Sequence, residues 1–188
     1  MAKMNSHAVF NNIKFVTGNP NKVREAGEIL GVTLEQVNLP QLQEIQTHDL
    51  AEIIQDKTRQ AYRAVNAPVL VEDSGLVFSA WNGLPGALVK WFESTVGCDG
   101  LLKMLEPFDN REAIALCYVG YHDGKDIKTA KGMVQGRVAD RLRGSNGFGW
   151  DTLFIPDGHD RTYAEMTAQE KNSISHRKRA FEALKEMI

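Results

Sequence analysis

The sequence predicts an α/β fold with a mixed, elongated sheet flanked by helices, arranged as two lobes around a central cleft. Short apolar runs alternate with amphipathic segments in the first part of the chain, which is typical of strands connected by helices. Two longer runs with strand character follow over residues 112–138, and a helix-start signal stands near the end. The 188 residues fit one domain, residues 1–188, which is large enough to bury a substantial core.

The first strand is expected at Ile13–Thr17, where a short apolar run leads into a tight turn. Asn19 suits the N-cap of a helix. Pro20 suits the first helical position, because its missing N–H would have no partner there in any case. The helical pattern continues to Leu30, and Gly31 is expected to end it.

The remaining elements follow from hydrophobic pattern and turn signals. In chain order we expect a strand near Val32–Asn38, a helix over Asp49–Val65, a strand over Pro68–Glu72 ended by Asp73-Ser74-Gly75, a helical stretch over residues 86–106, and strands at Glu112–His122 and Ile127–Val138. The segment His-Asp-Gly-Lys between the last two strands indicates a hairpin. Thr167 and Glu170 form a capping box that is expected to open a helix running to the C-terminus.

Composition narrows the class of protein. The formal net charge of −2 argues against long nucleic acid as a partner, because phosphate backbones favour a clustered basic excess. Cys98 and Cys117 are too few and too far apart for a disulfide framework or a structural zinc site. No apolar run approaches the ~20 residues that span a membrane. Residues 1–12 lack the apolar centre of a signal peptide, so we expect a loose leader on a cytoplasmic protein.

The turn at residues 17–22 is the first candidate binding element. Thr17, Gly18 and Asn19 precede a helix start, and Lys22 lies in its first turn. Backbone N–H groups, a helix N-terminus and a lysine together attract phosphate. The same pattern also fits an ordinary capped turn with a solvated lysine, which is the better interpretation of this segment taken alone. It is neither a Walker loop nor a GxGxxG fingerprint, so ATPases of that class and dinucleotide-binding dehydrogenases lose support.

Two adjacent carboxylates, Glu72 and Asp73, end an otherwise apolar strand and precede Ser74. Ligand crevices open at the ends of such strands. Carboxylate oxygens in a row suit Mg²⁺, which is held by a few carboxylates together with phosphate oxygens. A polar turn capped by Asp is the alternative interpretation. Glu44, in a polar stretch expected to be a loop, is a further carboxylate for the same site.

Lys57 and Arg177 each fall inside the apolar stripe of a predicted helix. A buried charge must be paired or must face a polar cavity. Snorkelling, in which the stem covers apolar surface and the charge reaches water, is the ordinary interpretation of one such residue. Two independent cases favour a shared anionic cleft.

Phe148 and Trp150 stand in a glycine-flanked segment that ends at Asp151. Glycines such as Gly149 let a backbone approach a ligand closely, and an aromatic face can stack on a base. A core strand with a bulge fits the same residues. His176 could likewise be an ordinary surface histidine.

Fragments from residue 15 to residue 177 occur together in the order found in one known family. They are Phe15-Val16-Thr17-Gly18-Asn19 with Lys22; Val69-Leu70-Val71-Glu72-Asp73-Ser74-Gly75-Leu76; Gly83-Leu84-Pro85-Gly86 with Lys90-Trp91-Phe92; Phe148-Gly149-Trp150-Asp151; and Tyr163-Ala164-Glu165-Met166 with Glu170-Lys171-Asn172 and Ser175-His176-Arg177. The sequence thereby resembles the inosine triphosphatase family, the non-canonical purine nucleoside triphosphate pyrophosphatases. Each fragment is weak alone, but the ordered set is highly specific.

The resemblance implies a reaction. Members of this family remove nucleotides such as ITP, dITP and XTP by cleaving between the α and β phosphates, which gives nucleoside monophosphate and pyrophosphate. They use Mg²⁺, for which Mn²⁺ is a possible substitute, and are typically cytoplasmic homodimers. The cleft would then be the substrate cleft of a single nucleotide pyrophosphatase domain.

The resemblance also implies roles for individual residues. Asp73 would be the general base and a metal ligand, Glu44 the other metal carboxylate, and Glu72 a weaker candidate ligand. The expected substrate-binding residues are Thr17, Gly18, Asn19, Lys22, Lys57, Asp73, Ser74 and Lys90 toward the phosphates, with Phe148, Gly149, Trp150, Asp151, Lys171, His176 and Arg177 around the base. Donors on His176 or Arg177 would favour the 6-oxygen of hypoxanthine over the amino group of adenine.

One segment departs from the family pattern. The family usually has Leu-Pro-Glu before an apolar residue and Gln, whereas here Leu39-Pro40 is followed by Gln41-Leu42-Gln43-Glu44-Ile45-Gln46. Aligning on Glu-Ile-Gln selects Glu44 and implies a short insertion, whereas aligning on Leu-Pro selects Gln41. We prefer Glu44 because a metal ligand needs the charge.

Three other classes of protein remain open. A house-cleaning pyrophosphatase for modified pyrimidines would use a similar cleft, although the residues around Phe148 and His176 favour purines. A non-catalytic nucleotide-binding module would need the lysines but not the Glu72-Asp73 pair. A nucleic-acid-binding protein is opposed by the net charge and by the lack of a basic run.

Overall fold

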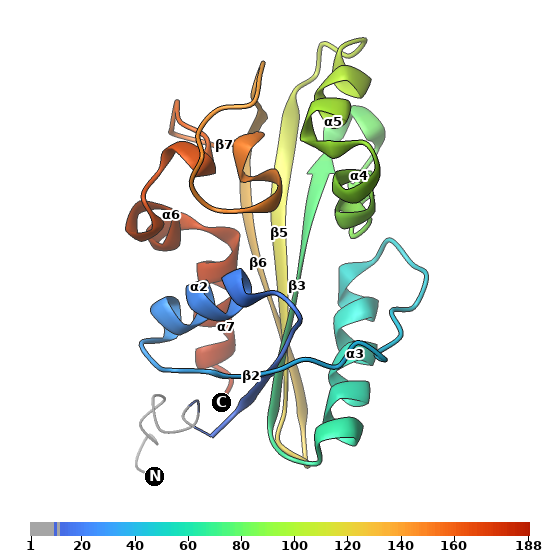
Figure 1. Ribbon diagram of the computed structural model, residues 1–188, viewed down its shortest axis with the longest axis vertical. Coiled ribbons are helices and arrows are strands. Elements are labelled where there is room, and N and C mark those ends of the chain that lie inside the picture. Colours follow the sequence, from blue (N-terminus) through green and yellow to red (C-terminus); the bar gives the residue numbers. More distant parts are fainter. Residues whose placement is uncertain (1–9, 11) are drawn as a thin grey trace.

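A mixed sheet runs the length of the molecule and is shared by two lobes (Figure 1). The computed structural model describes residue 10 and residues 12–188. The strands in that part of the chain are β1 (Lys14–Val16), β2 (Glu35–Val37), β3 (Val69–Phe78), β4 (Pro85–Gly86), β5 (Glu112–His122), β6 (Ile127–Val138) and β7 (Phe154–Pro156). Their order is β2-β1-β3-β5-β6-β7, with β4 paired to β3. β1 pairs in parallel with β2 and β3, and the other pairs are antiparallel.

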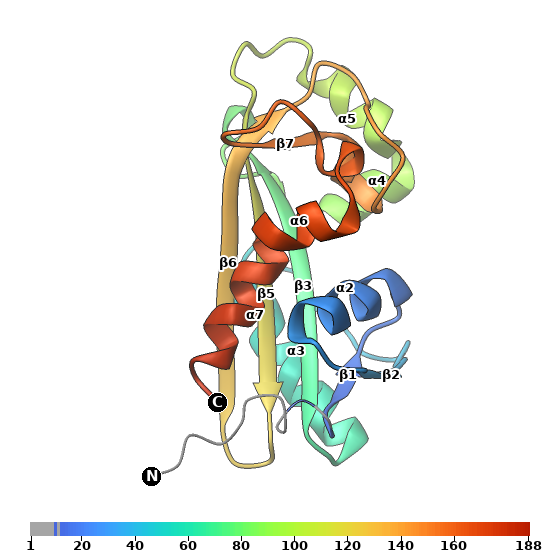
Figure 2. The ribbon, with the colours of Figure 1, turned by 90° about the vertical axis from the view of Figure 1, so that its left-hand side faces the viewer.

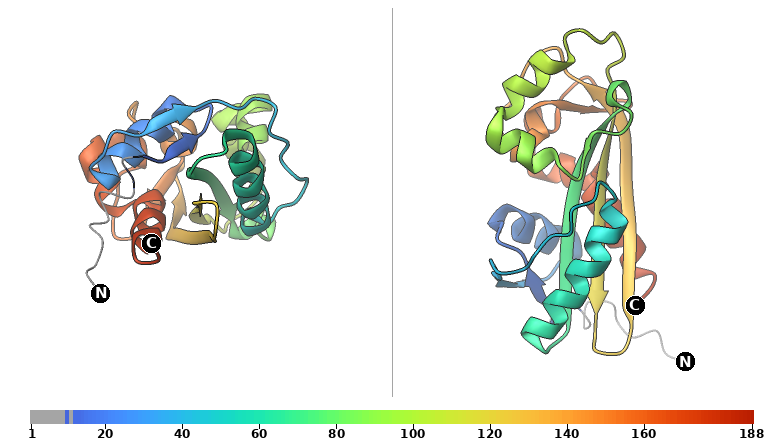
Figure 3. Two further views of the ribbon diagram at one scale, coloured as in Figure 1. Left: turned by 90° about the horizontal axis from the view of Figure 1, so that it is seen from below. Right: turned by 90° about the vertical axis from the view of Figure 1, so that its right-hand side faces the viewer.

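Helices cover both faces of the long central strands. They are α2 (Pro20–Leu30), α3 (Leu50–Val65), α4 (Val89–Thr95), α5 (Gly97–Leu105), α6 (Ala168–Ile174) and α7 (His176–Lys185), with 3-10 turns η1 (Ser79–Trp81), η2 (Gly149–Thr152) and η3 (Tyr163–Glu165). In the lower lobe α3 lies on one side of the sheet and α2 and α7 lie on the other (Figures 1 and 3). In the upper lobe, α4 and α5 lie on the opposite side from β7 (Figure 1), and both helices contact η2.

The apolar core follows this layering. One cluster joins α2 and α7 to the sheet through Phe15, Leu70 and Phe181, and a second joins α3 to the opposite sheet face through Ile54 and Val71. A third cluster fills the upper lobe. Adjacent residues of β3 thus pack against different helices, as the alternation of side chains along a strand requires.

Several sequence-based predictions are confirmed. The Asn19 side chain caps α2 by accepting from the Asn21 N–H, Pro20 is the first helical residue, and Gly31 ends the helix in the left-handed region at φ 70°. The hairpin of β5 and β6 has the expected bounds. The Thr167 capping box opens α6. These features depend on local chemistry, which the sequence displays directly.

Three predicted boundaries are wrong. β3 does not end at Glu72 but continues to Phe78, because β5 pairs with it over its whole length and holds Asp73-Ser74-Gly75 extended. The helical stretch over residues 86–106 is two helices, α4 and α5, and starts later than expected. The final helix breaks at Ser175, whose backbone is extended and whose side chain caps α7 by accepting from the Lys178 N–H.

The expected loose leader at residues 1–12 falls largely outside the described residues. Phe10, which is described, is fully buried in the cluster beneath α2 and α7, so the packed part of the chain begins earlier than expected. Among the described residues, no helix has both the length and the apolar character that crossing a membrane requires.

Candidate active site

A cleft of about 690 Å³ lies where the two lobes meet on the sheet. Figure 2 shows α2 of the lower lobe facing α4 and α6 of the upper lobe across this region. The lower wall comes from the β1–α2 turn, the segment after β2, and α3; the upper wall comes from α4, η2 and the start of α6 and α7. Every predicted substrate-binding residue lines this one cleft, as does Glu44, whereas Glu72 does not. The volume falls in the ~300–1,000 Å³ range of small-molecule sites.

The β1–α2 turn forms one end of the cleft. The Asn19 N–H donates to Thr17 Oγ1 at 3.1 Å, which closes the turn at the start of α2. Lys22, in the first turn of α2, extends to β3, where Nζ donates to the Glu72 carbonyl at 3.1 Å and lies 3.4 Å from Asp73 Oδ1. The arrangement places a helix N-terminus and an ammonium group side by side, which is a favourable site for a phosphate.

Lys57 of α3 links the two candidate metal carboxylates. Its Nζ lies 2.8 Å from Asp73 Oδ2 and 3.0 Å from Glu44 Oε1. Burial alone would lower the pKa of Lys57, but the charges of Asp73 and Glu44 outweigh it and raise that pKa well above its ordinary value. The lysine is therefore charged and paired, and it does not snorkel to open solvent.

The alternation of β3 sends the adjacent carboxylates Glu72 and Asp73 to opposite faces of the sheet. Asp73 points toward Lys57 of α3, and Glu72 points toward Arg177 of α7. Glu72 is fully buried, with Oε1 and Oε2 accepting from the Arg177 guanidinium at 3.2 and 3.3 Å. Glu72 is therefore paired with Arg177 in this structure, and its role as a weaker candidate metal ligand stays a prediction.

Arg177 is the central cation of a buried network. Besides Glu72, it donates to Glu25 of α2 and to Ser74 Oγ, the latter at 3.0 Å. Burial would raise the pKa of Glu72, but Arg177 and then Lys22 outweigh it and hold that pKa far below its ordinary value. Because most of its N–H groups are already engaged, Arg177 is less free to read a base than the sequence suggested.

Lys171 of α6 extends this network to the upper lobe. Its Nζ lies 2.8 Å from Glu25 Oε1 and 2.6 Å from Asp151 Oδ2, and all three side chains are buried. Asp151 also accepts from the Phe148 N–H at 2.8 Å, which fixes the start of η2. Desolvation raises the pKa of Asp151, and Lys171 opposes that rise. Asp151 therefore positions η2 and Lys171.

Phe148 and His176 form the aromatic end of the cleft. The half-buried Phe148 ring lies 4.9 Å from Lys171 Nζ and 5.4 Å from Arg177 Cζ, measured to the ring centroid. The His176 ring packs between Trp150 and Tyr163, at centroid distances of 5.2 and 5.9 Å. A flat ligand against Phe148 would meet an aromatic face with cations beneath it.

His176 is buried, and neither ring nitrogen has a hydrogen-bond partner among the described residues. Desolvation, followed by the charge of Arg177, lowers its pKa well below the ordinary value, so the ring is a neutral imidazole. A neutral imidazole offers one donor and one acceptor. The surface histidine considered from the sequence is therefore not what the fold contains. Gly132 of β6 allows the start of α7 to pack closely on the sheet and so to bury His176, because a Cβ at Gly132 would lie 2.0 Å from the His176 carbonyl oxygen.

Sequence reasoning missed two carboxylates of the site, Glu25 and Glu93. Glu25 lies at the edge of the buried stripe of α2, and the packing of α6 and α7 makes it the shared partner of Lys171 and Arg177. Glu93 of α4 lines the cleft three residues after Lys90. Its pKa is raised to about 7 by burial and then by repulsion from Asp151, against an opposing effect of Lys22.

The donor set fits a hard divalent cation together with a phosphate ligand. No group of three or more His, Cys, Asp or Glu side chains within residue 10 and residues 12–188 is arranged to hold a metal alone. Asp73 and Glu44, however, already hold a cation between them in the ammonium of Lys57. Two carboxylates beside a phosphate site are the usual protein contribution to a Mg²⁺ site that phosphate oxygens complete.

The fold and the cleft define a two-lobed α/β protein with a site for a phosphorylated aromatic ligand. Residues 13–187 match the Ham1 family, and the chain belongs to that family. It is 44% identical over 186 residues to an inosine triphosphate pyrophosphatase of Schizosaccharomyces pombe, covering 96% of both chains. It is 46% identical over 177 residues to inosine triphosphate pyrophosphatase 2 of Trypanosoma cruzi, covering 92% of this chain and 90% of that one.

Solved structures agree with this assignment. A HAM1 protein from Coxiella burnetii superposes with a TM-score of 0.80 at 29% identity, covering 93% of this chain and 98% of that one. A nucleoside-triphosphatase described as a dITP/XTP pyrophosphatase, from Mycobacterium abscessus, superposes with a TM-score of 0.71 at 28% identity, covering 92% and 98%.

Proposed function

We propose that this protein hydrolyses non-canonical purine nucleoside triphosphates, such as ITP, dITP and XTP, to the nucleoside monophosphate and pyrophosphate. The main support is the single cleft, which combines a phosphate-binding turn, a lysine-linked pair of carboxylates and an aromatic end with a buried neutral imidazole. The names of the relatives agree with this chemistry. A cytoplasmic homodimer is part of the same proposal.

The cations of the cleft would hold the triphosphate. Lys22 and the N-terminus of α2 lie beside Asp73, Lys57 lies on its other side, and Lys90 lines the upper wall. Neutralising the phosphate charges lets a nucleophile approach the phosphorus. Mg²⁺ bound by Asp73 and Glu44, or Mn²⁺ in its place, would supply a Lewis acid that polarises the phosphoryl oxygen.

Asp73 is the proposed general base. Its carboxylate stands between Lys22 and Lys57, so it lies directly beside the groups that would position the phosphates. It would take the proton of the attacking water as the new P–O bond forms, while the bond between the α-phosphorus and the bridging oxygen breaks and pyrophosphate leaves. The lysines would stabilise the charge that develops on the leaving group.

His176 is the proposed reader of the base. It is a neutral ring with an unpartnered N–H, so it would donate to the 6-oxygen of hypoxanthine or xanthine, whereas adenine presents an amino group there. A donor left unpaired costs about 1–3 kcal/mol, or roughly 5- to 150-fold in discrimination. Phe148 would stack on the purine, with Lys171 and Arg177 behind it.

The proposal is tested by pyrophosphate release from ITP, XTP, ATP, GTP and dUTP, each with and without Mg²⁺. We expect metal-dependent release from ITP and XTP, with the monophosphate as the other product and little release from ATP or GTP. Turnover of dUTP alone would overturn the purine assignment. Tight binding of nucleotides without any turnover would favour a binding module instead.

A further inference from the structure

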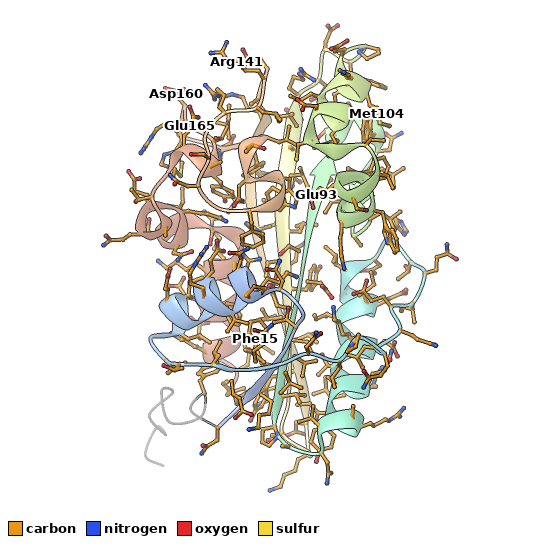
Figure 4. All side chains as sticks on the ribbon, in the orientation of Figure 1. Phe15, Glu93, Met104, Arg141, Asp160 and Glu165 are labelled. Atoms are coloured by element: carbon orange, nitrogen blue, oxygen red, sulfur yellow. The ribbon has the colours of Figure 1, made fainter. Side chains whose placement is uncertain are left out.

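A second cavity, of about 370 Å³, lies in the upper lobe, and three arginines line it. Arg111 immediately precedes β5, Arg137 lies in β6, and Arg143 lies in the segment between β6 and η2. Among the described residues, none lines both this cavity and the active-site cleft. Figure 4 shows Asp160, another lining residue, on the outer side of the upper lobe and away from Glu93 of the cleft. We call this second cavity the arginine pocket.

The backbone of each arginine in the pocket is held by regular structure. The Arg111 carbonyl accepts from the Val138 N–H at 2.8 Å, which extends the pairing of β5 and β6 by one residue. Arg137 belongs to the part of β6 that pairs with β7. The Arg143 N–H donates to the Thr152 carbonyl of η2 at 3.2 Å. The sheet and η2 therefore fix the positions from which the three side chains reach the pocket.

The guanidinium groups of the pocket carry more donors than the protein satisfies. Arg111 has no ion-pair partner among the described residues, and its Nη1 is buried without a hydrogen-bond partner. The Nε of Arg143 is also buried and makes no hydrogen bond, although a Glu165 carboxylate oxygen lies 3.5 Å away. Each guanidinium has five N–H donors, and buried donors are normally satisfied. A ligand rich in acceptor oxygens would satisfy them.

The acidic residues of the pocket compensate its arginines only partly. The Asp160 side chain is fully exposed and lies 3.4 Å from Arg137 Nη2, and its carbonyl accepts from Arg143 Nη2 at 2.9 Å. Asp140, the other acidic lining residue, is also exposed. Three arginines and two aspartates give the lining a net charge of +1. Exposed ion pairs are weak, so an anion can displace the Asp160 carboxylate from Arg137.

We propose that the arginine pocket binds a phosphate dianion, either inorganic phosphate or the phosphate group of a small ester, at a site separate from the cleft. The planar fork of a guanidinium matches pairs of phosphate oxygens. Phosphate offers more acceptor oxygens than a carboxylate does, which suits three guanidinium groups around one space. The cavity is also many times larger than the ~30 Å³ that one water occupies, so it has room for such an anion.

A bound anion would connect segments that are distant in the sequence. Arg143 lies in the segment that leads from β6 to Phe148, and its carbonyl accepts from Thr162 Oγ1 at 2.8 Å. An anion shared by Arg143, Arg137 and Arg111 would hold this segment to the paired ends of β5 and β6. A ligand that binds only the folded state stabilises it, so the pocket should make the stability of the protein depend on phosphate.

The first test is thermal unfolding of the full chain in inorganic phosphate at pH 7.5, with chloride at the same ionic strength as the reference. Nucleotide and Mg²⁺ are left out. Phosphate at about ten times its Kd should raise Tm by about 3–6 °C in a chain of this length. No rise over the chloride reference would overturn the proposal.

Variants assign the rise in Tm to the pocket. Arg111→Met should lose most of the rise, yet its Tm in chloride should not be lower than that of the wild type, because the variant removes an unsatisfied buried donor. An arginine with a purely structural role would lower Tm in both buffers. Arg137→Met should show the same loss of the rise. Arg59→Met, at an exposed position of α3, removes the same charge elsewhere and should keep the rise.

Arginine modification locates the anion. Phenylglyoxal reacts with accessible guanidinium groups, and peptide mapping gives the rate at each arginine. Phosphate at about ten times its Kd should slow the reaction about tenfold at Arg137, whose side chain is 46% exposed, and leave Arg59 unchanged. Equal slowing at both residues would overturn the proposal. So would a rise in Tm that persists in Arg111→Met and disappears in Lys57→Met, because it would place the anion in the cleft.

A second probe distinguishes the two sources of the phosphate group. The modification of Arg137 is measured with inorganic phosphate and with glycerol 3-phosphate at equal concentration. Slowing by inorganic phosphate alone supports a site for the free anion, and slowing by both supports a site that also accepts esters. Slowing by neither would overturn the proposal. These measurements involve no turnover, so their outcome is independent of the proposed hydrolysis.

Discussion

Replacing Arg177 with methionine removes the cation that joins three elements of the lower lobe while keeping most of the side-chain volume. The guanidinium, only 2% exposed, contacts Glu72 of β3 and Glu25 of α2 from its place in α7. Without it, Glu72 retains Lys22 at 3.6 Å and Glu25 retains Lys171 at 2.8 Å. Two buried carboxylates then share less positive charge than before, which favours the unfolded state.

Breaking a buried ion pair by removing one partner costs about 3–5 kcal/mol. Domains of this kind have a total free energy of unfolding of about 5–15 kcal/mol, so the loss is a large fraction. In a chain of 188 residues it corresponds to a fall in Tm of roughly 6–20 °C, at about 2–4 °C per kcal/mol. The expected effect of Arg177→Met is therefore chiefly on stability, ahead of any effect on the choice of base.

Urea unfolding of Arg177→Met, Glu72→Gln and the double variant measures the coupling between the two side chains. The double variant should be more stable than the sum of the single losses predicts. Arg161→Met, which breaks an exposed pair with Glu170, is the control and should leave the midpoint nearly unchanged. A loss below about 1 kcal/mol in Arg177→Met, or strict additivity in the cycle, would refute the argument that this buried pair supports the fold.

The same network gives a pH dependence. The pKa of Glu72 is far below its ordinary value in the folded protein, because Arg177 and Lys22 outweigh the effect of burial. The unfolded state therefore binds a proton at a higher pH than the folded state does. The stabilisation is fully present above the ordinary Glu pKa of about 4.3 and is lost as the pH falls below it. In Arg177→Met this acid-induced loss should be shallower.

Three further predictions concern the cleft. Asp73→Asn should abolish pyrophosphate release while circular dichroism shows an intact fold, and near-normal turnover would exclude Asp73 as the base. Chelation of Mg²⁺ should stop turnover, and Glu44→Gln should raise the metal concentration needed to restore it; an unchanged metal requirement would exclude Glu44 as a ligand. Because the folded pKa of Glu93 is raised to about 7, its ionisation destabilises the fold progressively as the pH rises from about 4.3 through 7. Glu93→Gln should therefore raise Tm relative to the wild type at pH 8 but not at pH 4, and equal shifts at both would contradict the assignment.

Local chemistry explains what the sequence predicted well. Asn19, Gly31 and the Thr167 capping box act on backbone groups within a few residues, so the helix ends they define are visible in the sequence. Lys57 and Arg177 each place a charge inside an apolar stripe, and this pattern predicted a shared cleft. Both residues line the same cleft in the structure. In both cases the residue type and its spacing carry the information.

Long-range pairing explains what the sequence did not show. Asp-Ser-Gly has the composition of a turn, yet β5 pairs beside it and keeps it extended within β3. Glu25 became a network residue only because α6 and α7 bring Lys171 and Arg177 against α2. The burial of Glu93 depends on η2 closing over α4, a contact between residues more than fifty positions apart. No local sequence pattern predicts such long-range contacts.

The pairing of cleft cations with carboxylates affects which anions the protein retains. Lys22, Lys57 and Lys171 each contact at least one Asp or Glu of the same cleft, and Arg177 is paired with the buried Glu72 outside its lining. An incoming phosphate must exchange with these internal counter-charges, so charge alone brings little gain to a polyanion such as RNA. A ligand that also fills the aromatic end and supplies hydrogen-bond donors gains where a bare phosphate does not. The cleft is therefore expected to bind the abundant simple anions of a cell only weakly.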